Sequence, residues 1–196
     1  GNVTGSNASG ISATNYGAGN LNISSTGAVT GGNGDGVYAY NSASGLDLTV
    51  AVGSASGSDN GIDARNNGSG ALAVTATGHV SGTNGDGVYV NNSSNGTSLT
   101  VAVGSASGGL AGIHAENYGS GALSITATGR VSGTQEDGVY AYNSASGTNL
   151  MVNVGSASGG DDGIDALNFG SGHLVINATG NVTGSNASGI SATNYG

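Results

Sequence analysis

One motif recurs eight times along this chain and limits what the chain can fold into. The motif starts with Gly, followed by Ile or Val at the second position, Ala (once Val) at the fourth and Asn at the sixth. The third and fifth positions vary freely. Such alternation of constrained and free positions is typical of a β-strand with one buried face. The eight copies begin at Gly10, Gly36, Gly61, Gly87, Gly112, Gly138, Gly163 and Gly189.

The spacing between copies alternates between 26 and 25 residues. Each interval holds two further strand-like pieces, an alternating one such as 72–76 and a short one around Val80, separated by Gly, Ser and Asn clusters. Three short strands that close after 25–26 residues predict one coil of a parallel β-helix. A six-residue sub-period, as in left-handed hexapeptide helices, is missing. We therefore expect an all-β, right-handed parallel β-helix (β-solenoid) with three strands per coil and about 7–8 coils.

The Asn at the sixth motif position occurs in all eight copies. If the coils stack in register about 4.8 Å apart, each side-chain amide can bond to the next and form a ladder. The other explanation is that Asn tolerates a left-handed turn conformation at this corner. The expected ladder consists of Asn15, Asn41, Asn66, Asn92, Asn117, Asn143, Asn168 and Asn194.

A larger repeat is superimposed on the coils. Residues 1–17 are identical to residues 180–196, an offset of 179 residues. We expect residues 1–196 to form a single continuous solenoid segment that represents one full 179-residue period of a tandem array plus a 17-residue overlap. An uncapped solenoid exposes sheet edges that invite pairing. The natural chain is therefore expected to continue on both sides, and the predicted partner is the chain itself, by end-to-end stacking or lateral association.

Charge excludes several classes of partner. Eleven acidic residues face only two Arg and no Lys, giving a net charge of −9. Nucleic acids and anionic membrane surfaces both require basic patches, so neither is expected as a partner. No apolar run is long enough to span a bilayer, so the segment is not expected to be embedded in a membrane. Without Cys, no disulfide or thiol chemistry is expected.

Aromatic residues are confined to one window of each coil. All eight Tyr and the single Phe lie at the free motif positions or directly after the motif. Aromatics beside carboxylates could bind surface glycans or mediate self-association; alternatively, Tyr is simply a good strand residue that packs on its neighbours. The candidate binding stripe consists of Tyr38, Tyr40, Tyr89, Tyr140, Tyr142, Asp63, His114 and Asp165.

Acidic residues also gather just before the motif glycine. Asp35, Asp86 and Asp137 are weak candidates for calcium ligands, because the string around Asp35 resembles a calcium-binding nonapeptide that here recurs only once in 51 residues. The alternative is a solvated acidic corner. No other metal or cofactor is expected.

The sequence gives little support to two other functions, ice binding and catalysis. Thr26, Thr77, Thr128 and Thr179 are spaced like the threonines of ice-binding solenoids, but glycines of the intervening coils interrupt the array. Catalysis is not expected, because the chain has no Lys, no long non-repeating loop, and three His in separate coils.

Three stretches carry a family resemblance: GDGVYAYNSASG (34–45), GIDARNNGSGAL (61–72) and GSGALSITATGRVSGT (119–134). They resemble the passenger repeats of large autotransporter adhesins from Gram-negative cell surfaces, and the resemblance extends over essentially the whole chain. It implies a secreted β-helical stalk at the bacterial cell surface. The expected function is that of an extracellular rod or fibre segment displaying a repeated face, with adhesion through the Tyr-rich stripe as the alternative.

Overall fold

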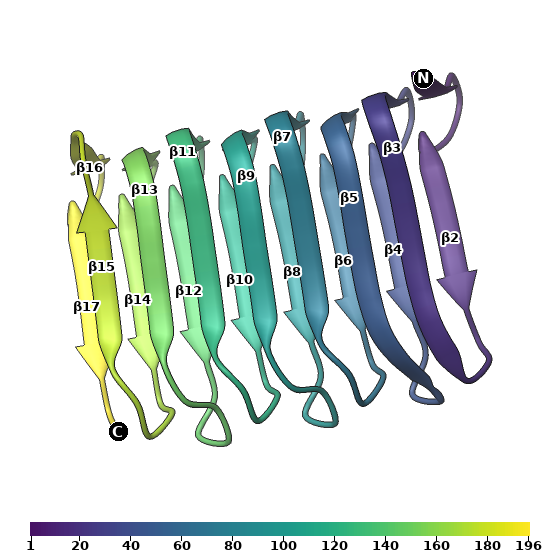
Figure 1. Cartoon of the computed structure of the whole chain (residues 1–196). Coiled ribbons are helices and arrows are strands. Elements are labelled where there is room, and N and C mark those ends of the chain that lie inside the picture. The colour runs from purple at the N-terminus through teal and green to yellow at the C-terminus, as the bar shows by residue number, and fades with distance from the viewer.

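The computed structural model describes all 196 residues, Gly1–Gly196, as β-strands and connecting loops without a helix. The strands form two parallel sheets that run side by side along the molecule (Figure 1). The chain visits the two sheets alternately, which produces a β-solenoid of about seven turns. No helical segment is present that could cross a bilayer.

The first sheet, here the motif sheet, contains the recurring motif. Its eight strands each cover the second to sixth motif positions and pair in parallel with the equivalent strand of the next coil, so that Ile113 faces Val88 and Asn117 faces Asn92. The predicted in-register stacking is thus confirmed. Its strands are β2 (Ile11–Asn15), β4 (Val37–Asn41), β6 (Ile62–Asn66), β8 (Val88–Asn92), β10 (Ile113–Asn117), β12 (Val139–Asn143), β14 (Ile164–Asn168) and β17 (Ile190–Asn194).

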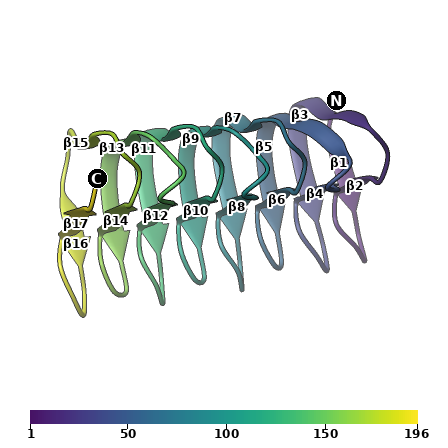
Figure 2. The same cartoon turned by 90° about the horizontal axis from the view of Figure 1, so that it is seen from below.

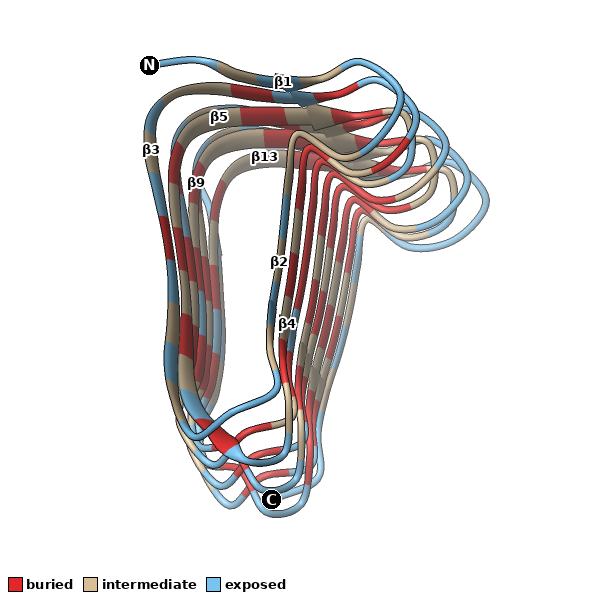
Figure 3. Cartoon of the chain, turned by 90° about the vertical axis from the view of Figure 1, so that its right-hand side faces the viewer, coloured by how far each residue is buried: buried red, intermediate tan, exposed pale blue.

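The second sheet, here the bent sheet, differs from the expectation of three strands per coil. The second and third expected pieces form one long strand in most coils, and only the last coil separates them. The long strands turn a corner part-way along their length (Figure 3). The bent sheet consists of β1 (Val3–Gly5), β3 (Gly19–Gly31), β5 (Gly45–Gly57), β7 (Leu72–Gly82), β9 (Leu99–Gly108), β11 (Leu123–Gly133), β13 (Leu150–Gly159), β15 (Leu174–Ala178) and β16 (Val182–Gly184).

A β-bulge at this corner explains why pieces two and three merge. The pairing register of β5 with β7 shifts after Val52, and Leu72 and Val80 are one residue further apart in sequence than their partners Leu48 and Ala55. An extra residue in one strand of a pair bends the strand without ending it. Backbone pairing therefore continues around the corner.

The core lies between the sheets and extends through all central coils. In the coil that starts at Gly87, the side chains of Val88, Val90, Leu99 and Val101 are fully buried. The motif glycine is required by close approach, because a Cβ on Gly87 would lie 2.5 Å from the Gly112 carbonyl oxygen of the next coil. Burying each Val or Leu contributes about 1.5–3 kcal/mol, which becomes possible only when coils stack.

The predicted asparagine ladder is present without a break. Each Nδ2 donates to the Oδ1 of the next Asn along the chain, at 2.8–3.1 Å from Asn15 to Asn194. The six inner members are fully buried. No residue other than glycine has a positive φ, so the alternative that Asn is there to adopt a left-handed conformation is wrong.

Loops that lead from the bent sheet into each motif strand project from the body in a row (Figures 2 and 3). These projecting loops, such as residues 83–87 before β8, lie beside the outer face of the motif sheet. The face and the loops together position the residues described next.

Candidate functional site

The outer face of the motif sheet carries all eight residues of the predicted stripe, in two rows. Cross-strand pairing forms the first row, which is Tyr38, Asp63, Tyr89, His114, Tyr140 and Asp165. The second row contains Tyr40 and Tyr142, separated by Arg65, Asn91 and Glu116.

Asp63 does not contribute to a displayed surface, contrary to its place in the predicted stripe. It is only 3 % exposed and forms two 2.8 Å hydrogen bonds with Arg65, whose Nε and Nη2 donate to the two carboxylate oxygens. The guanidinium of Arg65 lies 5.0 Å from the ring centre of Tyr89. Arg65 thus covers Asp63 and is itself held by a cation–π contact.

His114 has both aromatic and acidic neighbours on this face. Its imidazole is packed between Tyr89 and Tyr140, with ring centres 5.3 and 4.8 Å away. Its Nε2 lies 3.8 Å from a carboxylate oxygen of Glu116, and its Nδ1 lies 4.0 Å from Oδ2 of Asp86. Each ring nitrogen therefore faces a carboxylate.

These carboxylates control the charge of the imidazole. Burial alone would lower the pKa of His114, but Glu116, Asp86 and Glu136 outweigh burial and raise it. The pKa of Glu116 is lowered, first by His114 and further by the amide of Asn91, which donates to Glu116 at 2.8 Å. Both shifts favour an imidazolium–carboxylate pair.

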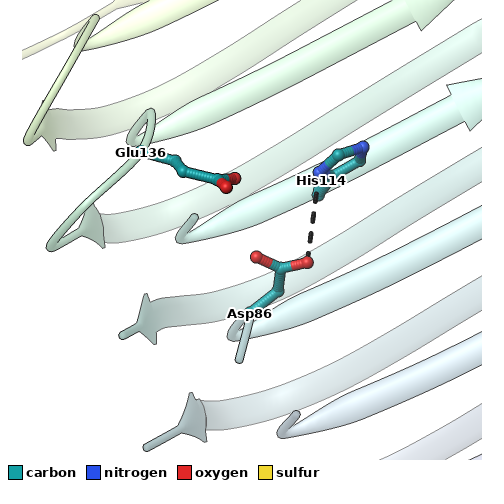
Figure 4. A group of neighbouring side chains, drawn as sticks. All are labelled: Asp86, His114 and Glu136. Carbon is teal, nitrogen blue, oxygen red and sulfur yellow. Dashed lines mark ion pairs between the residues drawn. The ribbon is translucent and has the colours of Figure 1, made fainter. Parts of the chain in front are cut away.

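Two carboxylates that the sequence analysis did not bring together lie near Nδ1 of His114. The carboxylates of Asp86 and Glu136 both point toward His114 from the projecting loops before β8 and β12 (Figure 4). One ligand-type atom from each of the three residues lies within 4.8 Å of the other two. The Asp and Glu sit one and two residues before a motif glycine and the His two residues after one, so an aligned table of coils could have suggested their proximity.

The residue before the motif glycine forms a second ladder. Its Oδ1 accepts the backbone N–H of the equivalent residue in the next coil, as from Asn60 to Asp35, Asp86 to Asn60, and Ala111 to Asp86. This second ladder stops at Ala111, which has no side-chain acceptor. It begins again at Asp137, whose Oδ1 accepts the N–H of Asp162. The structure thus assigns a backbone-capping role to Asp35, Asp86 and Asp137.

The three calcium candidates do not come together. Successive members of this set, Asp35, Asp86 and Asp137, lie two coils apart, because each ends a different 26-residue (long) coil and a 25-residue (short) coil lies between. Asp137 instead lies near Asp161 and Asp162. The pKa of Asp137 is raised to about 6, mainly because the carboxyl is partly buried and also because Asp161, Asp162 and Asp165 are close. The hydrogen bond from the N–H of Asp162 acts in the opposite direction and lowers the pKa.

A second group of aromatics follows the motif strands toward the C-terminus. Tyr118, Tyr142, Phe169 and Tyr195 form a continuous series with ring centres 5.3, 5.5 and 4.4 Å apart. Tyr118 and Phe169 are 37 % and 36 % exposed. This series offers a partly exposed aromatic strip that begins beside Glu116, whose carboxylate accepts from the hydroxyl of Tyr118 at 3.3 Å.

The threonines considered for ice binding lie at the corner of the bent sheet, on a different face. The hydroxyls of Thr77, Thr128 and Thr179 donate at 3.2–3.3 Å to glycine carbonyls of the preceding short coil. Shallow hollows lie along this corner, for instance between Thr26 and Thr77. The hydroxyls are therefore engaged by the backbone, and glycines alternate with threonines as expected.

Comparison with known protein families finds no match for this chain, and comparison with curated proteins and with solved structures finds none either.

Proposed function

We propose that this chain is a segment of an extracellular rod, secreted or held at a bacterial cell surface, whose main task is to span distance and display a repeated outer face. The observation that supports this proposal most directly is the unbroken asparagine ladder, which accompanies parallel pairing of both sheets from end to end. A structure of this kind resists proteolysis because its backbone is paired along nearly its whole length.

The proposal includes the right-handed, three-sided form of the β-helix. Parallel strands joined by crossovers are right-handed in nearly all proteins. The corner within each long strand would divide the bent sheet into two of the three sides.

Recombinant chains of one, two and three 179-residue copies test the rod. Seven coils at about 4.8 Å each should add about 34 Å to the maximum dimension per copy in small-angle X-ray scattering. A constant increment with an unchanged cross-section supports a continuous rod. Increments that shrink with copy number would indicate separate folded units on flexible joints and would refute it.

Location needs its own measurement. Antibodies raised against the chain should label intact cells of the producing organism as strongly as permeabilised ones. Labelling that requires permeabilisation would contradict surface display.

Adhesion through the aromatic face is the second candidate, favoured by the half-exposed aromatics that lie beside carboxylates. Such surfaces stack on sugar rings while carboxylates accept hydroxyl hydrogen bonds. The partner would be a surface glycan, and the proposal needs neither catalysis nor a cofactor.

Replacing Tyr38, Tyr89 and Tyr140 with Ser tests this second candidate. Glycan-array binding should be lost while circular dichroism and the scattering profile stay unchanged. Met151→Ser is the matched control, because Met151 is 37 % exposed on the other sheet. Binding that survives the triple change would exclude the stripe as the adhesive surface.

A further inference from the structure

We propose that Asp86, His114 and Glu136 form a binding site for a divalent cation of the borderline class, of which Zn²⁺ is the representative. The site would connect the projecting loops of two long coils across the short coil between them. It goes beyond the proposed rod function, which does not depend on it.

The position of the cluster coincides with the interruption at Ala111 of the second ladder, which is formed by the residues before the motif glycines. Neighbouring positions before the motif glycine carry Asp86 and Asp137, whereas the coil between them carries Ala111. The short side chain of Ala111 presents no charge to His114, so the carboxylates that approach the imidazole come from the loops on either side.

Asp86 provides an independent indication of a ligand. Its side chain is 8 % exposed, and its Oδ1 accepts the N–H of Ala111 at 2.9 Å. Its Oδ2 accepts no hydrogen bond, and Nδ1 of His114 at 4.0 Å is beyond hydrogen-bonding distance. Oδ2 therefore remains free to accept on a side chain that is otherwise almost enclosed, and a cation between Oδ2 and Nδ1 would be bound by both atoms.

His114 is oriented in advance for coordination. Tyr89 and Tyr140 hold the plane of the ring, and Glu116 faces Nε2 on the side away from Asp86. A carboxylate beside Nε2 favours the tautomer that carries its proton there once Nδ1 binds a cation, as in the carboxylate–histidine–metal arrangement of many metal sites. Glu116 would thus be a positioning residue and not a ligand.

The donor set selects the class of metal. One imidazole nitrogen with two carboxylate oxygens suits Zn²⁺ and its neighbours, whereas Ca²⁺ requires six to eight oxygens. Ligands about 2.0–2.2 Å from a tetrahedral ion lie about 3.3–3.6 Å apart. The separations from Glu136, whose side chain is exposed, would close by rotation of that side chain. The 4.0 Å between Nδ1 of His114 and Oδ2 of Asp86 would close by a movement of about 0.5 Å. The fourth position would remain open to water.

Isothermal titration of the untagged, chelator-treated chain with ZnCl₂ tests the site. We expect saturable binding of one Zn²⁺ per chain and no comparable binding of CaCl₂. Asp86→Asn keeps the acceptor for Ala111, and Glu136→Gln changes an exposed side chain, so both variants should fold, as checked by circular dichroism. Each should weaken Zn²⁺ binding at least tenfold, and His114→Gln should abolish it.

Controls and a second signal complete the test. Replacing His79 and His173, which lie outside the cluster, with Gln should leave Zn²⁺ binding unchanged. Co²⁺ should produce the intense visible absorption of a tetrahedral site in the natural chain and not in His114→Gln. The proposal is overturned by an absence of saturable binding, by Zn²⁺ binding that survives His114→Gln, or by equal affinity for Ca²⁺.

Discussion

Asn92 shows how much a single amide contributes to the stacking of coils. Its Nδ2 donates to Asn117 at 3.0 Å and to the carbonyl oxygen of Thr97 at 3.2 Å, while its Oδ1 accepts from Asn66 at 3.1 Å. All of these atoms belong to the buried corner of the ladder. Removing the amide takes away one hydrogen bond from each of three residues, Asn66, Thr97 and Asn117.

Asn92→Ala is therefore expected to lower the free energy of unfolding by about 2–4 kcal/mol, because three hydrogen bonds at a buried corner are lost and each contributes about 0.5–1.5 kcal/mol. Asn194→Ala is the matched control, since Asn194 is an exposed member of the same ladder, and it should cost less than about 1 kcal/mol. Urea denaturation followed by circular dichroism measures both. Equal losses would show that burial of the ladder is irrelevant to its contribution.

Asp137 gives the chain a pH dependence of predictable sign. Its pKa of about 6 in the folded chain exceeds the usual 3.8, so ionisation disfavours the fold. The stability associated with its protonated form is fully present below about pH 4 and is lost as pH rises through about 6. The raised pKa values of Asp35, Asp86, Asp165 and His114 act in the same direction, and the lowered pKa of Glu116 opposes them.

We expect the melting temperature to be higher at pH 5 than at pH 7.5. Asp137→Asn keeps the acceptor for the N–H of Asp162 and should reduce this difference, because it removes one of the titrating groups. Thermal denaturation of both chains at the two pH values provides the measurement. An identical pH difference in the variant would rule out Asp137 as a source of the effect.

The turn between β8 and β9 shows how an element depends on a single glycine. A Cβ on Gly96 would lie 2.4 Å from Oδ1 of Asn92, inside the ladder. Gly17 lies in the turn between β2 and β3, where the step from Asn15 to Leu21 is six residues. The nearest atom to a Cβ on Gly17 is 3.6 Å away. The seven-residue step from Asn92 to Leu99 therefore needs glycine for close approach.

Gly96→Ala should destabilise the chain clearly and move the Asn92 side chain, whereas Gly17→Ala should be nearly neutral. Denaturation midpoints test stability, and side-chain amide resonances of the ladder asparagines in NMR spectra report on geometry. A neutral Gly96→Ala would mean that the turn can relax without disturbing the ladder.

At the element scale, the sequence predicted the features that depend on the spacing of residues. It missed those that depend on where a strand bends or where a side chain points. The motif strands, their register and the asparagine ladder follow from spacing alone. The merging of the second and third pieces did not, because a one-residue bulge at Thr77–Gly78 looks like a strand boundary in the sequence. The convergence of Asp86 and Glu136 on His114 was missed because loop side-chain directions are not encoded in a repeat length. Asp63 was misjudged because its bidentate pairing with Arg65 depends on both side chains bending together.

At the scale of the whole molecule, stability should decrease toward both ends. Ile190 is 47 % exposed, whereas its equivalents in the preceding coils, Ile164 and Val139, are fully buried. In a solenoid each coil is stabilised only by its neighbours, so terminal coils open locally.

Hydrogen exchange followed by mass spectrometry should show slow exchange in β8, β10 and β12 and progressively faster exchange toward β2 and β17. Extending the chain by a second copy should slow exchange at the old C-terminal coil. Uniform exchange along the chain, or fast exchange in the centre, would contradict the nearest-neighbour description.

The asparagine ladder also gives the molecule a polarity. Every amide donates in the same direction, from Asn15 toward Asn194, so any run of these coils presents oxygen acceptors at one extremity and N–H donors at the other. Two such rods can join coaxially head to tail, whereas meeting head to head would oppose like groups. A contact of that kind does not close on itself. A filament built from these coils would therefore have two chemically distinct tips and a defined direction of growth.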